Sequence, residues 1–332
     1  MAGARWTVMT VKLALAGDTM LGRGVAEWLA RYGPGALFAP ELKETVAEAD
    51  AFVLNLECCV SDRGRPAPVP GKPFFFRAPP LAVEALAELG VDAVSLANNH
   101  ALDFGPTALA DTLALLAAAG IQVVGAGATA EQARAPVVLT VGGLRIGLMG
   151  VVDHAEEFAA GPGRPGTAYA DLASGVPAWL TEAVRALRRR TDITLVAVHW
   201  GPNMVGHPVP YVRQAAPVLT AAGASLVVGH SAHVFHGFTR QVLFDLGDFI
   251  DDYAVHPLLR NDLGLLFLVT LDASAVRRVE AVPLTLKYCH TRLARGSDYT
   301  WIRDRLSRVC ATFGTDITDR DGRLTASWTD RS

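Results

Sequence analysis

Five hydrophobic runs in this chain end at polar side chains that can bind a metal ion. The runs are LALAGD, AFVLNLE, VDAVSLANNH, ITLVAVH and SLVVGHSAH, and they end at or near Asp18, Glu57, His100, His199 and His230. Uninterrupted apolar runs of this length are typical of strands that are buried on both faces. Ligands of open α/β sheets bind beyond the carboxyl ends of the strands. The pattern therefore predicts a metal-assisted active site at five strand ends.

The segments between these runs have apolar residues at helical spacing, so the chain alternates strands with helices. Gly120 and Gly223 follow two of the helical segments, where glycine often ends a helix. The alternation early in the chain and the strand-rich second half predict a mixed two-layered sheet sandwich covered by helices. Because we find no repeat and no linker, we expect one domain over residues 1–314 and a polar C-terminal tail over 315–332.

Composition narrows the possible functions. The chain has 332 residues, 51% of them hydrophobic and 19% charged, and a net charge of -3, which disfavours nucleic-acid binding. The most apolar later stretch is interrupted by Asp111 and several glycines, so no membrane span is expected. The N-terminal apolar run belongs to the first strand and leaves no room for a signal peptide, which predicts a cytoplasmic protein with reduced cysteines.

A loop at residues 62–80, DRGRPAPVPGKPFFFRAPP, combines many prolines and glycines with Lys72, Arg77 and three phenylalanines. Loops of this length often cover active sites, although a surface crossover with phenylalanines docked on the core fits the sequence equally well. Trp200 directly follows His199. We expect it to pack at the floor of the pocket, where it is also available to stack on a substrate.

The ordered motifs GDTMLGR, NLE, NNHALDFG, HWG and GHSAH, followed by DLGDF, closely resemble those of the CapA-like proteins. That family is named after a poly-γ-glutamate capsule protein and belongs to the calcineurin-like metallophosphoesterase superfamily. The resemblance covers roughly residues 11 to 255. It implies an α/β fold of four layers, an α/β/β/α sandwich with a metal site at the strand ends.

By position in the motifs, the resemblance implies a set of metal ligands that combines carboxylate, amide and imidazole groups: Asp18, Glu57, Asn99, His199 and His230. His233 completes the last histidine motif of the family. Carboxylate and amide oxygens suit hard cations, whereas imidazoles suit transition metals. The set therefore does not distinguish Ca, Mg, Mn and Zn, although its oxygen content favours Ca or Mg. No organic cofactor is implied.

The sequence departs from the dinuclear phosphoesterases at informative positions. Met20 stands where those enzymes carry a histidine, and thioether sulfur is a poor ligand for a hard cation. Asp245 and Asp248 stand where the family often has Ser and Asn. The loss of one ligand and the gain of carboxylates predict one divalent cation rather than two.

Two pairs of histidine and aspartate are candidates for acid–base work. His100 and Asp103 lie three residues apart, and a carboxylate that accepts from one ring nitrogen raises the basicity of the other. Asp245 and Asp248 are candidate partners of His230 or His233. Structural roles remain open for these aspartates: Asp103 as a helix cap before Pro106, and the other two as loop caps.

Two reaction classes fit these features. Our main prediction is epimerisation of a peptide α-carbon, because the chain resembles cytoplasmic members of the family that include a lasso-peptide epimerase. Inversion needs an acid and a base on opposite faces of the carbon, which two His/Asp pairs would supply. The substrate would be a ribosomally made precursor peptide that lies under the 62–80 loop, with Lys72 or Arg77 at its terminal carboxylate. The alternative is a metal-dependent hydrolase of a phosphoester, an amide or a γ-glutamyl bond, and a non-catalytic binding module fits least well. The sequence leaves the oligomeric state open.

Overall fold

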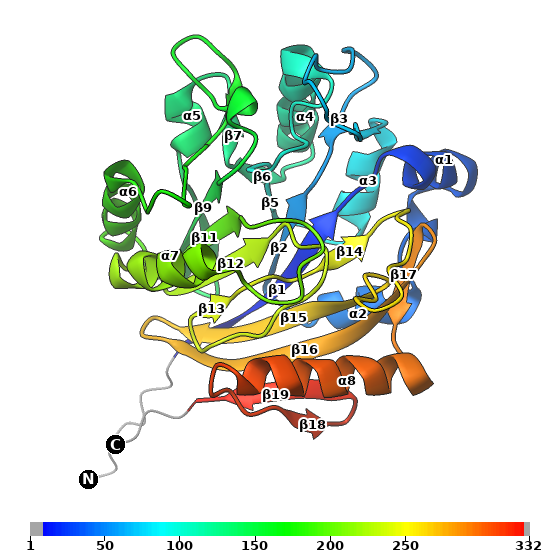
Figure 1. The fold of residues 1–332 in the computed structure, drawn as a ribbon, viewed down its shortest axis with the longest axis vertical. Helices are drawn as coiled ribbons and strands as arrows, with labels where there is room; N and C mark the ends of the chain where they lie inside the picture. Colours follow the sequence, from blue (N-terminus) through cyan, green and yellow to red (C-terminus); the bar gives the residue numbers. More distant parts are fainter. Residues whose placement is uncertain (1–8, 329–332) are drawn as a thin grey trace.

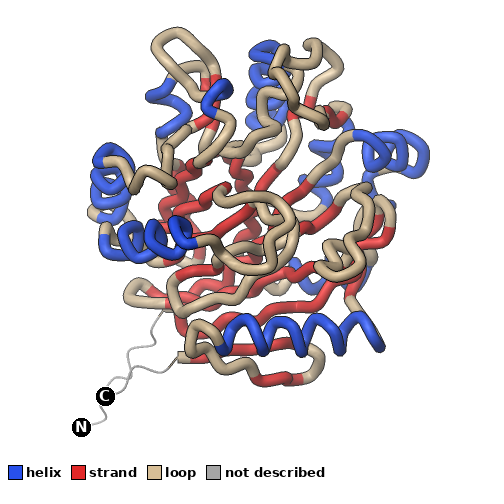
Figure 2. Tube along the Cα trace, viewed as in Figure 1, coloured by secondary structure: helices blue, strands red, loops and turns tan. Residues whose placement is uncertain are grey.

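Two β-sheets pack face to face at the centre of the protein, whose structure is a computed structural model that describes residues 9–328. Helices cover the outer face of each sheet (Figure 1). Figure 2 shows the strands gathered in the middle and most helices at the periphery. Three separate clusters of buried apolar side chains lie between the layers. The predicted α/β/β/α sandwich is therefore confirmed.

The larger sheet runs from the C-terminal strands to the first strands of the chain. Its order is β18 (Thr318–Arg320), β19 (Arg323–Ser327), β16 (Val276–Lys287), β15 (Leu263–Asp272), β1 (Thr10–Thr19), β2 (Ala51–Leu56), β5 (Ala93–Ser95) and β6 (Gln122–Val124). Two short strands join it from the side: β14 (Asp248–Ile250) pairs with β1, and β17 (His290–Leu293) pairs with β16. The strands β1, β2, β5 and β6 are parallel, so their carboxyl ends lie at one edge.

The smaller sheet has the order β13 (Val242–Leu243), β12 (Leu226–His230), β11 (Ile193–His199), β9 (Leu144–Val152) and β8 (Val137–Val141). All neighbours are parallel except β8 and β9. Two further pairs of short strands lie in the loops: β3 (Cys59–Val60) with β4 (Arg77–Ala78), and β7 (Ala126–Gly127) with β10 (Gly166–Thr167).

The helices divide between the two outer faces. Apolar residues of the first group pack against the larger sheet: α1 (Arg23–Tyr32), α2 (Pro40–Val46), α3 (Leu81–Glu88) and α4 (Gly105–Ala118). The second group packs against the smaller sheet: α6 (Ala178–Arg188) and α7 (Pro210–Ala221). The remaining elements are α5 (Ala130–Arg134), α8 (Gly296–Ala311) and the 3-10 turns η1 (Pro34–Ala36) and η2 (Glu156–Phe158).

Strand β1 shows why the hydrophobic runs are continuous. Leu13 and Leu15 point into the cluster between the two sheets, whereas Ala14 and Ala16 point into the cluster under the helices. Because successive side chains of a strand face opposite sides, a strand that is covered on both sides needs apolar residues at every position. The predicted strands ending at the five polar side chains therefore form as expected.

The C-terminal region differs from its prediction. The expectation of a polar tail is wrong for residues 318–327, which form β18 and β19, and β19 pairs with β16 over Arg278–Ala281. The reason is a short buried segment that the polar composition conceals: Leu324, Thr325 and Ala326 of β19 are all buried, while the residues of β18 are exposed.

Candidate metal centre

The strand ends of both sheets meet around a compact group of buried side chains. One ligand atom from each of Asp18, Glu57 and His233 lies within 4.8 Å of the others. Asp18 lies in β1 near its end, Glu57 directly follows β2, and His233 follows β12 of the other sheet. All three residues are buried. The packing of the two sheets thus brings together side chains from the beginning and the end of the matched motifs.

Glu57 has the most informative environment of the group. Its side chain is fully buried, and among the described residues neither carboxylate oxygen has a hydrogen-bond partner. Burial, reinforced by the negative charge of Asp18, raises the pKa of Glu57 well above its ordinary value. Oε1 lies 3.9 Å from Nε2 of both His100 and His199. Two unpartnered oxygens facing imidazoles are a donor set that fits a divalent cation.

Asp18, by contrast, is held as an anion. Asn55 Nδ2 donates to Oδ1 at 2.8 Å, and the backbone N–H of Ser231 donates to Oδ2 at 3.1 Å. Burial alone raises the pKa of Asp18, but the contact with His233 and the nearby imidazoles outweigh burial and lower it. Asn55 also lies 3.3 Å from His199 Nδ1, so one amide aligns a carboxylate and an imidazole of the centre.

His199 and His230 present neutral imidazoles to the centre. Burial lowers the pKa of His230 to about 4 and that of His199 well below its ordinary value. A neutral ring is the form that binds metal ions. His230 Nδ1 lies 3.7 Å from Asp18 Oδ1. Asn99 Oδ1 is buried without a hydrogen-bond partner in the described chain, and its role as a ligand stays a prediction.

His233 lies inside the carboxylate group. Its Nδ1 is 2.8 Å from Asp248 Oδ1 and 3.3 Å from Asp18 Oδ2, and its acid–base role stays a prediction. Burial lowers the pKa of His233, but the charges of Asp248 and Glu57 outweigh burial and raise it well above the ordinary value. The turn that carries it is strained, because Ser231 and His233 have φ values of 110° and 58°.

The two additional aspartates have separate roles. Asp248 forms the predicted pair with a histidine, and that histidine is His233. Asp245 pairs with neither His230 nor His233 through a hydrogen bond: it accepts from the backbone N–H groups of Ala232 at 2.9 Å and Gly247 at 2.8 Å. It therefore caps the loop, which was the structural alternative left open for it. Burial raises the pKa of Asp245 to about 8.

His100 and Asp103 form the predicted pair, with 2.6 Å between Nδ1 and Oδ2. Burial lowers the pKa of His100 to about 4, although Asp103 acts in the opposite direction. The backbone N–H of Phe76 donates to Asp103 Oδ2 at 2.6 Å, and the Phe76 ring stacks on His100 with 4.0 Å between centroids. Lys72 Nζ lies 3.1 Å from Asp103 Oδ1 and donates to the Asn99 carbonyl at 2.7 Å. The 62–80 loop therefore holds the pair in place.

The three residues predicted to contact the substrate, Lys72, Arg77 and Trp200, lie in different surroundings. Lys72 lies in the centre but is already engaged by Asp103. Arg77 lies outside: its guanidinium packs over Phe104 at 4.3 Å, and Nη1 donates to the carbonyl of Arg63. Trp200 is 2% exposed and its Nε1 donates to the Phe244 carbonyl, so its indole lies in the core rather than at an open surface. It is a core residue, because it packs under α7.

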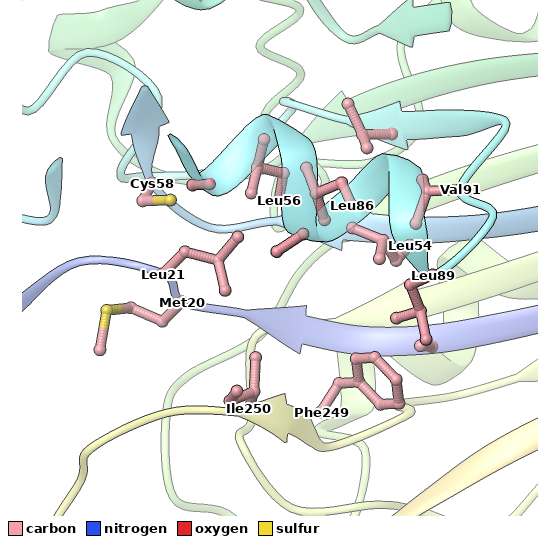
Figure 3. Close-up of a cluster of buried hydrophobic side chains, with 14 of the residues drawn as sticks. Met20, Leu21, Leu54, Leu56, Cys58, Leu86, Leu89, Val91, Phe249 and Ile250 are labelled. Atoms are coloured by element: carbon pink, nitrogen blue, oxygen red, sulfur yellow. The ribbon is translucent and has the colours of Figure 1, made fainter. Parts of the chain in front are cut away.

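Met20 also lies in the core rather than in the centre. Its sulfur accepts a hydrogen bond from the backbone N–H of Gly22 at 3.1 Å. Figure 3 shows Met20 and Leu21 among the side chains of β2, α3 and β14. A groove of about 530 Å³ opens next to Asp103, between residues 64–68, 102–107 and 157–165. Part of the 62–80 loop lines this groove, and the binding of a substrate there stays a prediction.

Sequence reasoning missed several polar residues around the centre. Asn55 interrupts the apolar run AFVLNLE, and an isolated amide in a buried strand was the available signal. Asn98 Nδ2 donates to Asn55 Oδ1 at 3.0 Å and steadies it. Tyr253 lies edge-on to His233 with 5.3 Å between centroids, and nothing in its local sequence indicated that contact.

Comparison with known proteins agrees with this geometry. The family model described as "Bacterial capsule synthesis protein PGA_cap" matches residues 12–253. The chain belongs to this family. It is a CapA-like protein of the metallophosphoesterase-type superfamily, whose members are metal-dependent, and its buried acidic and histidine group is suited to a metal ion.

Relatives of the PGA_cap family match nearly the whole chain. A Mycobacterium tuberculosis protein named "Probable polyglutamine synthesis accessory protein" is 33% identical, over 95% of each chain. The Bacillus subtilis "PGA biosynthesis protein CapA" is 28% identical over 92% of this chain and 82% of its own. A hypothetical protein of Thermus thermophilus has a similar structure, with a TM-score of 0.42 and 15% identity over 85% of this chain and 96% of its own.

None of the helices in residues 9–328 has the length and apolar character that a membrane crossing requires.

Proposed function

We propose that this protein is a metal-dependent hydrolase that cleaves amide bonds of a glutamate polymer. One observation carries the proposal: the buried, unpartnered carboxylate of Glu57 lies 3.9 Å from the ring of His100, which is itself paired with Asp103. A cation site with one acid–base residue beside it is the arrangement that hydrolysis needs. The names of the relatives, which refer to PGA and polyglutamine synthesis, support the polymer as the substrate class.

The residues of the chain account for the proton transfers. When bound, a divalent cation acts as a Lewis acid on the bond under attack. His100 is neutral near pH 7 because burial lowers its pKa to about 4. Its Nδ1 faces Asp103, so Nε2 is left to accept the proton of the attacking water. The same nitrogen then gives that proton to the leaving nitrogen as the amide C–N bond breaks.

The contacts of Lys72 and Arg77, two cations of the 62–80 loop, favour an amide over a phosphoester. Phosphoryl transfer relies on cationic side chains that stabilise the spread negative charge. Asp103 and the Asn99 carbonyl already bind the ammonium group of Lys72. Arg77 packs on Phe104 away from the centre. An amide brings no such charge to the reacting atoms, so the centre needs no further cation there.

Peptide epimerisation is a second candidate, and one observation favours it. Two His–Asp pairs, His100 with Asp103 and His233 with Asp248, flank Glu57. A two-base inversion of an α-carbon needs such an arrangement. His233 weakens this candidate, because its Nδ1 also lies 3.8 Å from Glu57 and 3.3 Å from Asp18, among the expected metal ligands. Only His100 is clearly free for proton transfer.

One experiment separates the candidates. The protein is supplied in turn with Mg, Ca, Mn and Zn and incubated with oligo-γ-glutamate, with a peptide carrying a free C-terminus, and with a phosphodiester. The water contains heavy oxygen in one series and deuterium in another, and the products are analysed by mass. Shorter oligomers with heavy oxygen in the new carboxylate are the expected result. One deuterium at an α-carbon without cleavage would establish epimerisation instead, and phosphate-ester cleavage alone would contradict the amide substrate.

A further inference from the structure

Arg23 occupies an unusual backbone position at the start of α1. Its φ is 49°, in the left-handed region that is costly for a residue other than glycine. Asp252 holds the turn: Oδ2 accepts the backbone N–H of Gly24 at 2.9 Å and lies 3.2 Å from Arg23 Nε. A Cβ at position 24 would lie 2.9 Å from that same oxygen and closer still to the Tyr288 hydroxyl, so a larger residue would displace these side chains. The fold thus holds Arg23 in a defined direction.

The guanidinium of Arg23 points over an aromatic wall. Its central carbon lies 5.3 Å from the ring centroid of Phe74, 5.6 Å from that of Phe76 and 5.9 Å from that of Tyr253. The side chain keeps 36% of its surface exposed. In the described part of the chain its two terminal nitrogens make no hydrogen bond, because Asp252 contacts only Nε. The planar end of the arginine is therefore left free for a ligand.

The same wall contacts the histidines of both His–Asp pairs. The Phe76 ring stacks on His100 at 4.0 Å, and the Tyr253 ring lies edge-on to His233 at 5.3 Å. Arg23 is therefore one aromatic ring away from each of the two His–Asp pairs. A ligand group bound by Arg23 would lie beside the reacting bond rather than at a distant surface.

Tyr253 adds a second free donor. Its hydroxyl oxygen is buried and has no hydrogen-bond partner within residues 9–328. Burial and the negative charge of Glu57 raise the pKa of Tyr253 well above its ordinary value, so the hydroxyl stays protonated. A buried hydroxyl without an acceptor costs free energy, and a ligand oxygen would relieve that cost.

We propose that Arg23 and Tyr253 form the subsite for the free α-carboxylate of the glutamyl unit next to the scissile bond. This inference rests on the proposed amide hydrolase. Each unit of a γ-linked glutamate chain carries one such carboxylate, and a guanidinium binds a carboxylate through two parallel hydrogen bonds. A guanidinium also forms such paired hydrogen bonds with a phosphate group. The site offers it only one arginine, which also shares its charge with Asp252, and this favours the singly charged carboxylate.

The test uses the full chain loaded with metal and two matched substrates, oligo-γ-glutamate and its α-carboxamide counterpart. Arg23→Gln is expected to raise KM for the carboxylate substrate about ten- to a hundredfold, with a smaller change in kcat. It is expected to leave KM for the carboxamide unchanged. Arg23→Lys should recover part of the loss, and Tyr253→Phe should change KM in the same direction. The matched control is Arg31→Gln, because Arg31 lies on the same helix and packs over Tyr32 at 5.1 Å.

A binding measurement by titration calorimetry keeps this inference separate from the proposed reaction. Loss of oligomer binding in Arg23→Gln but not in Arg31→Gln supports the subsite, even where no cleavage is seen. The absence of cleavage would contradict only the hydrolase. Cleavage with unchanged KM in Arg23→Gln would overturn the subsite and leave the hydrolase standing. Equal losses for both substrates, or no oligomer binding by the unaltered protein, would also overturn it. The subsite would also be overturned if inorganic phosphate displaced the oligomer at the same concentration as glutarate.

Discussion

Asp18 and Asp248 are register partners on the adjacent parallel strands β1 and β14. Both are buried, and Nδ1 of His233 lies between them, 3.3 Å from Asp18 and 2.8 Å from Asp248. One imidazole cannot neutralise the two aspartates and Glu57 together, since each buried charge needs compensation. The fold therefore concentrates negative charge where a cation would be most strongly bound.

The first prediction concerns metal binding. Glu57→Gln removes the unpartnered charge and is expected to lower the content of divalent metal in the purified protein well below that of the unaltered chain. Metal ions should also raise the melting temperature of the unaltered protein, because they bind only the folded state. Elemental analysis and thermal unfolding measure both effects. Glu48→Gln is the control, since Glu48 pairs with Arg323 at the surface, and equal losses in both variants would argue against the site.

The second prediction concerns His100. His100→Gln removes the proton carrier and is expected to lower kcat by about a hundredfold or more while metal content stays unchanged. Steady-state kinetics and elemental analysis on the same sample test it. His290→Gln serves as the control, because His290 hydrogen-bonds the Ala36 carbonyl instead. A loss of metal in His100→Gln would make His100 a ligand rather than an acid–base residue.

The third prediction compares two cations of the 62–80 loop. Lys72→Met removes the ammonium group 3.1 Å from Asp103 and should lower kcat about tenfold, because the His100–Asp103 pair loses its support. Arg77→Met should change kcat less than about twofold, since Arg77 packs on Phe104. The pH profile of kcat should shift only in Lys72→Met. Similar kinetics in the two variants would contradict the positioning role.

The fourth prediction concerns the close approach of the backbone that carries Asp18. A Cβ at Gly17 would overlap the carbonyl of Gly247, whereas a Cβ at Gly35 meets nothing nearer than 3.8 Å. Gly17→Ala is therefore expected to lower the free energy of unfolding by about 1–3 kcal/mol and to lower metal affinity. Gly35→Ala should do neither. Urea unfolding measures the first effect. An unchanged unfolding midpoint in Gly17→Ala would show that the backbone shifts to accommodate the methyl group, and would contradict the prediction.

The fifth prediction concerns acid stability. Burial raises the pKa of Asp272, but hydrogen bonds from Ser274 and Arg277 outweigh it and lower the pKa from 3.8 to about 2. The resulting stabilisation is complete above the unfolded pKa of 3.8 and is lost as the pH falls through about 2. Asp272→Asn should therefore unfold about 1 kcal/mol more easily at pH 7. Urea titrations across this range should show the difference shrinking at low pH, and a constant difference would contradict the prediction.

The fold was largely predictable because both central sheets are covered on both faces. Strands such as β1 and β11 therefore appear as unbroken apolar runs, which are easily recognised. Short elements were not predictable. β3 and β4 have two residues each, and β18 is fully exposed, so their sequences carry no periodic signal. β3 pairs with β4, and β18 pairs with β19, so each of these strands depends on a partner rather than on a pattern of its own.

The site was predictable in its members but not in their arrangement. His230 and His233 belong to one motif, and the sequence does not reveal which imidazole enters the carboxylate group. That choice follows from left-handed backbone at Ser231 and His233, which non-glycine residues rarely adopt. Asp245 and Asp248 were equally indistinguishable, because strand register places only Asp248 opposite Asp18. Arg23 was not predictable as a site residue, because its aromatic neighbours come from two segments that are distant in sequence.

The C-terminal pair of strands has a consequence for solubility. β16 is long, and β19 covers it at Arg278–Ala281 while β17 covers Leu284–Lys287. A chain shortened after residue 314 would expose the first of these stretches as an open edge, which is a template for pairing with another molecule. The intact protein instead ends the sheet at β18, whose three residues are exposed and include Asp319 and Arg320. We expect the last strands to protect the molecule against aggregation.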